Sequence, residues 1–230
     1  MKQILQKFIM KRPPQNNSEY VHKINDYTIF IVCMMAFFSC TILTLFQIRS
    51  IDYNIEIFLN SFARKSKFVN ALLSSLTYDS MTVGVLMAAI FYVWFNDKKD
   101  NNRKEIITGT VISFFSGALS RIVQLAMPSH LRPLHDPNLH LATPYWIDPD
   151  AFNHWASFPS DHAALLGGLA YTIYRSSNSL GIVSFLFILI INTTRMFFGY
   201  HFFTDIAAGT ALGISCVIAS TPLNKTRLVN

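Results

Sequence analysis

Long apolar stretches recur along this 230-residue chain, and they constrain its fold more than any other feature. They cover about residues 27–48, 80–95, 106–127, 162–174, 180–198 and 203–220. A hydrocarbon core about 30 Å thick needs roughly 20 helical residues to cross it. Because 51% of the residues are hydrophobic and only 14% are charged, the pattern predicts an all-α, polytopic membrane helix bundle with six transmembrane helices. We expect one membrane domain over residues 27–220, between a polar segment 1–26 and a tail 221–230.

Polar stretches separate the predicted helices. Residues 49–78 mix charged and apolar side chains at roughly helical spacing, which predicts an amphipathic interfacial helix. Residues 96–105 predict a solvated loop. Pro128 is expected to end the third helix, because proline lacks the amide donor and clashes with the preceding turn. A polar loop then runs to about residue 158.

The basic residues orient the predicted bundle. Twelve of the 19 Lys and Arg residues lie in segments 1–26 and 96–105, at Arg175 and in the tail, which alternating helices place on one face. Short cytoplasmic loops are enriched in Lys and Arg, so we expect both termini on the cytoplasmic side of the membrane. The net charge of +6 is attributed to this orientation, and no nucleic-acid partner is expected.

On this topology, charged and titratable residues from distant parts of the chain share the non-cytoplasmic face. Arg132 follows the third helix, His162 begins the fourth, and Arg195, His201 and Asp205 surround the junction of the last two. Such residues at the edge of a span are costly and indicate function. Guanidinium groups bind phosphate oxygens in bidentate geometry, and an imidazole supported by a carboxylate can attack phosphorus. The set predicts phosphate-ester chemistry.

Spacing suggests individual roles. Asp205 follows His201 by one helical turn, which pairs a nucleophile with a supporting carboxylate, and His162 can give a proton to the leaving group. Ser160 lies just ahead of the fourth helix, where free amides favour an anion. The histidines at 130, 135, 140 and 154 lack the spacing of metal ligands. They are expected to be solvated loop residues, and no metal or cofactor is expected.

Two motifs resemble those of a known family: Pro159-Ser160-x-His162 and Arg195-x5-His201-x3-Asp205. With Arg132-Pro133, they resemble the signatures of the type 2 phosphatidate phosphatase and vanadium haloperoxidase superfamily. The resemblance covers about residues 106–213 and implies a nucleophilic histidine, an acid histidine, and arginines and a serine that bind phosphate. Residue by residue, these roles fall on His201, His162, Arg132, Arg195 and Ser160, with Asp205 supporting the nucleophile.

Two departures from the family pattern leave alternatives open. Leu125 stands where the first signature usually has a lysine. Arg121 is the nearest upstream basic residue, and a loop insertion could bring it to the same phosphate, or it could only snorkel to the interface. Asp161 stands where glycine is usual. Its carboxylate could tune leaving-group protonation or head-group preference, or it could act as a helix cap.

The resemblance implies an integral membrane hydrolase that cleaves phosphate from a membrane lipid, with phosphatidate, phosphatidylglycerol phosphate and polyprenyl diphosphate all compatible. The second-signature form Phe-Pro-Ser-Asp-His-Ala resembles the bacterial undecaprenyl diphosphate phosphatases more than the phosphatidate enzymes, which favours a polyprenyl diphosphate. Two alternatives stay open: a lipid phosphotransferase, and a catalytically silent protein that binds lipid phosphates. The sequence does not determine the physiological lipid or the oligomeric state.

Overall fold

The computed structural model describes the backbone of residues 17–127, 130–146, 148, 150, 152 and 155–226, and the side chains among those from 26 to 220. These residues form eight α-helices, one short 3-10 helix and no strand. The elements are α2 (Asn17–Leu45), α3 (Ser50–Asn60), α4 (Lys67–Ser75), α5 (Asp79–Asn96), α6 (Asp100–Ala126), η1 (Pro133–His135), α7 (Asp161–Ser176), α8 (Asn178–Phe197) and α9 (Phe203–Thr226).

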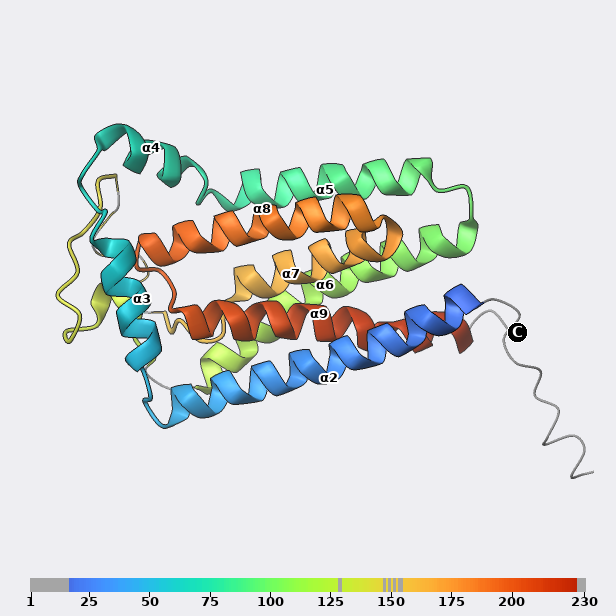
Figure 1. Cartoon of the computed structure of the whole chain (residues 1–230), viewed down its shortest axis with the longest axis horizontal. Coiled ribbons are helices and arrows are strands. Elements are labelled where there is room, and N and C mark those ends of the chain that lie inside the picture. Colours follow the sequence, from blue (N-terminus) through green and yellow to red (C-terminus); the bar gives the residue numbers. More distant parts are fainter. Residues whose placement is uncertain are drawn as a thin grey trace, which may run out of the picture.

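Six helices run side by side in alternating directions, and both ends of the described chain lie at the same end of the bundle (Figure 1). The opposite end carries α3, α4 and the loop between α6 and α7. The predicted all-α membrane bundle is confirmed. Within the described residues, α2, α5, α6, α8 and α9 are long and apolar enough to cross a membrane.

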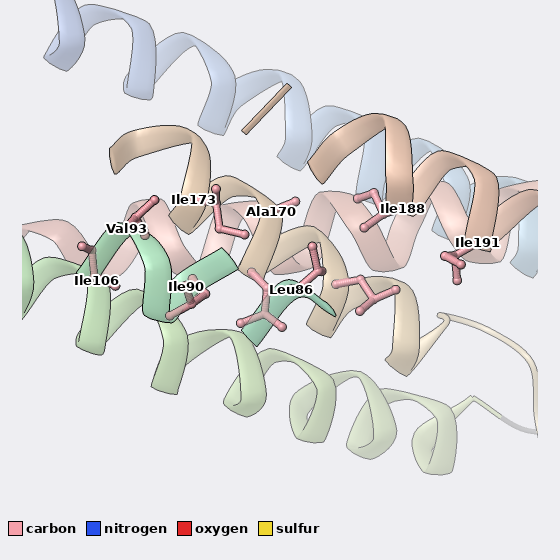
Figure 2. Close-up of a cluster of buried hydrophobic side chains, with 10 residues drawn as sticks. Leu86, Ile90, Val93, Ile106, Ala170, Ile173, Ile188 and Ile191 are labelled. Carbon is pink, nitrogen blue, oxygen red and sulfur yellow. The ribbon is translucent and has the colours of Figure 1, made fainter. Parts of the chain in front are cut away.

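The remaining helix of the bundle, α7, is shorter than these five and lies at the centre of the bundle. Its 16 residues rise about 24 Å, and it packs against α5, α6, α8 and α9. Ala170 and Ile173 of α7 meet side chains of α5 and α8 in one buried apolar cluster (Figure 2). Outward-facing side chains such as Phe91 and Leu189 are instead more than half exposed, as expected for helices that face lipid.

Gly209 and Gly213 of α9 allow its backbone to approach the backbone of α7 closely. A Cβ atom at Gly209 would lie 2.2 Å from the Ser160 carbonyl oxygen, and one at Gly213 would lie 2.0 Å from the Ala164 carbonyl oxygen. Small residues let helix backbones approach this closely in membranes. The contact sets the beginning of α9 against the beginning of α7, and so sets the third signature against the second.

Two sequence predictions need correction. The expected loop at 96–105 is helical from Asp100 onward, because Lys and Arg are good helix formers and Asp97 accepts hydrogen bonds from the Lys99 amide at 2.8 Å and the Asn102 side chain at 2.9 Å. The single interfacial helix expected within 49–78 is two helices, α3 and α4. Arg64 takes a left-handed conformation between them (φ 60°).

Candidate active site

The three sequence signatures meet at the end of the bundle that carries α3 and α4 (Figure 1). Arg132 directly precedes η1, Ser160 caps α7, and His201 lies in the turn between α8 and α9. The Ser160 amide donates a hydrogen bond to the Asp205 carbonyl at 3.0 Å, which ties the second signature to the third. The convergence expected from the sequence is therefore present.

The turn between α8 and α9 depends on a glycine. Gly199 has a φ of +71°, a conformation that residues with a Cβ atom rarely adopt. Its carbonyl accepts a hydrogen bond from the Leu134 amide at 2.9 Å. This bond holds the turn, and hence His201, against the segment that follows Arg132.

His201 is 1% exposed, and its hydrogen bonds define its tautomer. Nδ1 lies 3.1 Å from the Ser157 carbonyl oxygen and 3.7 Å from Asp205 Oδ2. Because a carbonyl only accepts, Nδ1 carries the proton, and the unprotonated Nε2 accepts a hydrogen bond from Arg132 Nη1 at 3.3 Å. Burial, then the nearby charges of Arg132 and Arg195, lower the pKa of His201 below its usual value although Asp205 opposes them. The ring is therefore neutral near neutral pH.

Asp205 is fully buried, and its carboxylate contacts other groups besides His201. Its Oδ2 accepts a hydrogen bond from the Phe202 amide at 2.8 Å, at the start of α9, and its Oδ1 lies 3.2 Å from His130 Nε2. The expectation that His130 is a solvated loop residue was wrong, because its side chain is 3% exposed. Arg49 reaches the other ring nitrogen of His130 at 3.0 Å and compensates its burial.

Arg132 is held rigidly beside the nucleophile. Its Nη1 donates to the Tyr200 carbonyl at 2.7 Å, its Nε donates to the Trp155 carbonyl at 3.2 Å, and the guanidinium lies 4.6 Å from the centre of the Phe152 ring. Burial lowers the pKa of Arg132 from 12.5 to about 10. The side chain therefore stays charged at neutral pH, as a phosphate ligand requires.

Arg195, near the end of α8, is 6% exposed and faces a carboxylate that sequence reasoning missed. Its Nη2 donates to Oδ1 of Asp79, the first residue of α5. Its Nε is buried without a hydrogen-bond partner among the described residues. A buried guanidinium donor without a partner is costly, and an anion bound there would satisfy it.

His162 lies on the same side as Asp79. Its Nδ1 is 3.3 Å from Asp79 Oδ1, and its Nε2 is 3.2 Å from the Thr82 hydroxyl. His162 also lies within electrostatic range of His201. The side chain of Asp79 is 70% exposed, so this half of the site faces the aqueous edge of the bundle.

Ser160 and Asp161 both serve the beginning of α7. The Ser160 hydroxyl accepts a hydrogen bond from the Ala163 amide at 3.3 Å, and Asp161 Oδ1 accepts from the His162 amide at 2.9 Å. Ser160 is therefore the N-cap of α7, and Asp161 is the first residue of the helix. Ser160 is fully buried, and its amide and hydroxyl are both engaged within the protein.

Arg121 lies beside Arg132 although the two are 11 residues apart. Its guanidinium stacks 3.5 Å from the centre of the Trp155 ring, while the carbonyl of Trp155 accepts from Arg132 Nε. Arg121 also donates to Gln124, whose amide nitrogen donates to the Pro159 carbonyl at 2.6 Å. Leu125, at the usual lysine position, is 78% exposed, so that position faces away from the site.

Comparison with known proteins supports the helical membrane fold. The chain is similar to the crystal structure of the first transmembrane PAP2 type phosphatidylglycerolphosphate phosphatase from Bacillus subtilis, with a TM-score of 0.57, 15% identity, and coverage of 87% of this chain and 96% of that chain. The model of the PAP2 superfamily matches residues 129–228. That part of this chain therefore matches the superfamily that the sequence signatures resemble. None of the curated proteins matches it.

Sequence reasoning missed groups that lie outside the three signatures. They are Asp79 and Thr82 beside His162, His130 beside Asp205, and the Ser157 carbonyl beside His201. An acidic residue at a helix start is also favoured by the helix dipole, so Asp79 gave no separate signal. Among the described residues, no group of three His, Cys, Asp or Glu side chains is arranged to hold a metal ion; His154 lies outside them.

A second polar region of the bundle lies at the end opposite the candidate site. Glu105, Gly109, Thr172 and Arg175 line a cavity there, between α6, α7 and α9. Arg175 lies 3.2 Å from Glu105 and 3.7 Å from Asp26. Because these carboxylates already neutralise the arginine, the cavity is a poor site for a phosphate.

Proposed function

We propose that this membrane protein is a phosphatase that hydrolyses a lipid phosphate or diphosphate through a phosphohistidine intermediate on His201. The observation that carries the proposal is the state of the His201 ring. Its Nδ1 faces the Ser157 carbonyl, and its unprotonated Nε2 lies beside the Arg132 guanidinium. A nucleophilic nitrogen next to a fixed cation is what attack on an anionic phosphate needs.

In the first step, His201 Nε2 forms a bond to phosphorus while the bond from phosphorus to the leaving oxygen breaks. His162 gives the leaving oxygen a proton. Asp205 and the Ser157 carbonyl stabilise the positive charge that the imidazole gains. The phosphoryl group remains on His201, and the dephosphorylated lipid leaves into the bilayer.

Two arginines bind the phosphoryl oxygens in this proposal. Arg132 is fixed by two carbonyl groups, and Arg195 offers its unpartnered Nε. Bidentate guanidinium contacts suit phosphate oxygens, and they stabilise the charge of the transition state. Arg121 adds a third positive charge, in place of the missing signature lysine, because it stacks on the residue that also contacts Arg132.

In the second step, water attacks the phosphorus of phosphohistidine and the bond to Nε2 breaks. His162, now unprotonated, takes a proton from that water, so that inorganic phosphate leaves and both histidines return to their first state. The exposed position of Asp79 beside His162 supports this role, because water reaches that side of the site.

The favoured substrate is a polyprenyl diphosphate. The Phe-Pro-Ser-Asp-His-Ala form of the second signature supports this class, and exposed apolar side chains around the bundle suit a lipid chain beside the helices. The similar Bacillus subtilis protein is described as a phosphatidylglycerolphosphate phosphatase, which makes that lipid a second candidate.

We place the site at the non-cytoplasmic face of a bacterial inner membrane. The site end of the bundle lies opposite both described chain ends (Figure 1), and the Lys and Arg bias favours cytoplasmic termini. Cysteines introduced at Lys98 and His140 test this assignment. A membrane-impermeant thiol reagent applied to intact cells should label position 140 only, and labelling of position 98 alone would reverse the orientation.

The central experiment measures inorganic phosphate release in detergent by the purified wild type and by His201→Ala. The substrates are a polyprenyl diphosphate, phosphatidylglycerol phosphate and phosphatidate. His140→Asn is the matched control, because His140 is exposed and has a φ of 43°, which asparagine tolerates. We expect His201→Ala to lose at least about 10⁴-fold in turnover and the control to keep it.

A chemical trap separates the remaining functions. Alkaline quenching of the wild type with phosphorus-labelled lipid should preserve labelled phosphohistidine, and His201→Ala should show none. Product that forms only with an added acceptor alcohol would indicate a phosphotransferase. Lipid retained without phosphate release would indicate a binding protein, and unchanged turnover in His201→Ala would exclude His201 as the nucleophile.

A further inference from the structure

We propose that His130, held by Arg49, is a positioning residue that fixes Asp205 and the Ser157 carbonyl around His201. The inference rests on the proposed function, because it assigns a role in the reactivity of the same nucleophile. His130 belongs to none of the three signatures, and its sequence position in a polar loop gives no sign of burial. The ring and the backbone of His130 both contact groups around His201, and aromatic rings pack against the His130 ring.

The ring of His130 connects a cation to a carboxylate. Arg49 Nη2 lies 3.0 Å from His130 Nδ1, and His130 Nε2 lies 3.2 Å from Asp205 Oδ1. Arginine only donates hydrogen bonds, so Nδ1 must be the acceptor and the ring proton must be on Nε2. Arg49 thereby selects the tautomer that directs an N–H group at Asp205.

His130 matters to Asp205 because the carboxylate is fully buried. Asp205 Oδ2 already accepts from the Phe202 amide, and His130 is the polar group that faces Oδ1. His130 Nε2 and Asp205 Oδ1 lie 3.2 Å apart, and neither atom has a hydrogen-bond partner among the described residues. A buried carboxylate that loses a donor is harder to keep charged. Its orientation toward His201 is then also less restricted.

The backbone of His130 acts on the other side of the nucleophile. Its carbonyl accepts a hydrogen bond from the Ser157 amide at 3.0 Å, and the Ser157 carbonyl in turn accepts from His201 Nδ1 at 3.1 Å. One residue therefore touches both groups that stabilise the imidazolium form of His201. This double contact distinguishes His130 from a side chain that only fills space.

Aromatic rings hold His130 in this orientation. Its ring meets the edges or faces of Phe158 and Phe202 at centroid distances of 6.0 and 5.6 Å. Arg49 lies 5.4 Å from the centre of the Phe202 ring, and Asp136 pairs with Arg49 at 2.9 Å. The Arg49 guanidinium is therefore fixed on two sides, which favours one position of the histidine ring.

The same network reaches the interfacial helix α3. Tyr53 of α3 donates a hydrogen bond to Asp136 at 2.8 Å. The hydrogen bonds that Asp136 accepts from Asn138 and Tyr53, with the charge of Arg49, outweigh burial and lower the pKa of Asp136. Asp136 therefore stays charged near neutral pH, and it anchors Arg49 on the side away from His130.

Other titratable groups also face this region. Asp52 of α3 accepts from the Thr204 amide at 3.0 Å and the Thr204 hydroxyl at 2.7 Å, and it lies within electrostatic range of His130. Burial, followed by Asp205 and Asp52, raises the pKa of Glu56 well above its usual range. The titratable and charged groups around the ring are therefore Arg49, Asp52, Glu56, Asp136 and Asp205.

The test compares His130→Ala, His130→Gln and the control His140→Asn in full-length protein in detergent. Groups that orient a reacting residue from behind are worth about 10- to 100-fold in activity, and we expect His130→Ala to lose this much in kcat. KM should stay within about twofold, because His130 does not contact the phosphate. His130→Gln should recover part of kcat, since its amide nitrogen can replace Nε2 as a donor.

The pH profile supplies a readout that a merely structural brace would not change. In His130→Ala, the acidic limb of kcat/KM, which reports protonation of His201, should move to lower pH, because a less well stabilised Asp205 charge supports the imidazolium form of His201 less. Thermal unfolding and gel filtration give the folded fraction used to normalise each rate. Arg49→Met should act in the same direction with a smaller effect, and its combination with His130→Ala should be less than additive.

Two results would overturn the inference. One is a normalised kcat of His130→Ala equal to that of His140→Asn. The other is a loss in His130→Ala that glutamine does not reduce and that leaves the acidic limb in place. These results are distinct from failure of the proposed function, which would appear as unchanged turnover or absent phosphohistidine in the His201 experiment.

Discussion

The two candidate catalytic histidines each face an aspartate, but the two aspartates are in opposite environments. Asp205, beside His201, is fully buried. Asp79, beside His162, has a side chain that is 70% exposed and also pairs with Arg195. The first pair lies in a closed polar network, whereas the second lies at the edge of the bundle where water enters.

This difference in exposure between the two aspartates matches the roles proposed for the two histidines. A nucleophile gains from fixed donors and acceptors in a dry surrounding, since these need no reorganisation when charge develops. A group that protonates a leaving oxygen and then activates water needs access to both. An exposed carboxylate suits that task, although its attraction for a nearby cation is weakened by solvent and salt.

Neutralising each aspartate should change kcat most and should show whether the two aspartates differ in importance. We expect Asp205→Asn to lower kcat by about 10³- to 10⁴-fold, as loss of a buried carboxylate behind a catalytic histidine does, with little change in KM. Asp79→Asn should lower kcat by only about tenfold and also lower KM, because Arg195 is freed for phosphate and a nearby negative charge is removed. Steady-state kinetics on both variants decides this. Equal losses would mean that exposure does not separate the two roles.

Removing the acid histidine should have an effect that depends on the leaving group. We expect His162→Asn to lose about 10²- to 10⁴-fold on phosphatidate, whose alkoxide leaving group needs a proton. The loss should be smaller on a polyprenyl diphosphate, whose leaving group is a phosphate that departs with less help. Parallel kcat measurements on the two lipids make the comparison. A loss of the same size on both would remove His162 from the role of acid.

The smallest effect concerns pH. Because burial lowers the pKa of His201, its protonation should limit kcat/KM only below its ordinary value of about 6.5. As pH falls through the lowered pKa, Nε2 gains a proton and the nucleophile is lost. A rate profile from pH 4 to 9, on the order of one point per half unit, measures the acidic limb. A limb clearly above 6.5 would contradict a neutral, buried nucleophile.

The sequence predicted some parts of the fold and the candidate site but not others. The apolar stretches predicted the five long spans. The alternating order of the helices predicted that Arg132, Arg195 and His201 lie at one end of the bundle. The sequence could not show that His130 is buried, because a histidine in a polar loop looks solvated until Arg49 and Asp205 are placed around it. The apolar stretch that forms α7 is the least regular of the six. A helix enclosed by four others needs neither the full length of a membrane span nor a continuous lipid-facing surface.

The sequence by itself determined the membrane bundle and the positions of its signature residues along the chain, because hydrophobic length and short-range spacing are properties of local segments. Only the tertiary structure decided which groups complete the site. Asp79, Ser157 and His130 come from an α5 start and from loop positions whose contacts are set by close packing of α9 on α7. Such contacts join residues tens of positions apart, and their energies depend on burial and geometry that no local pattern encodes.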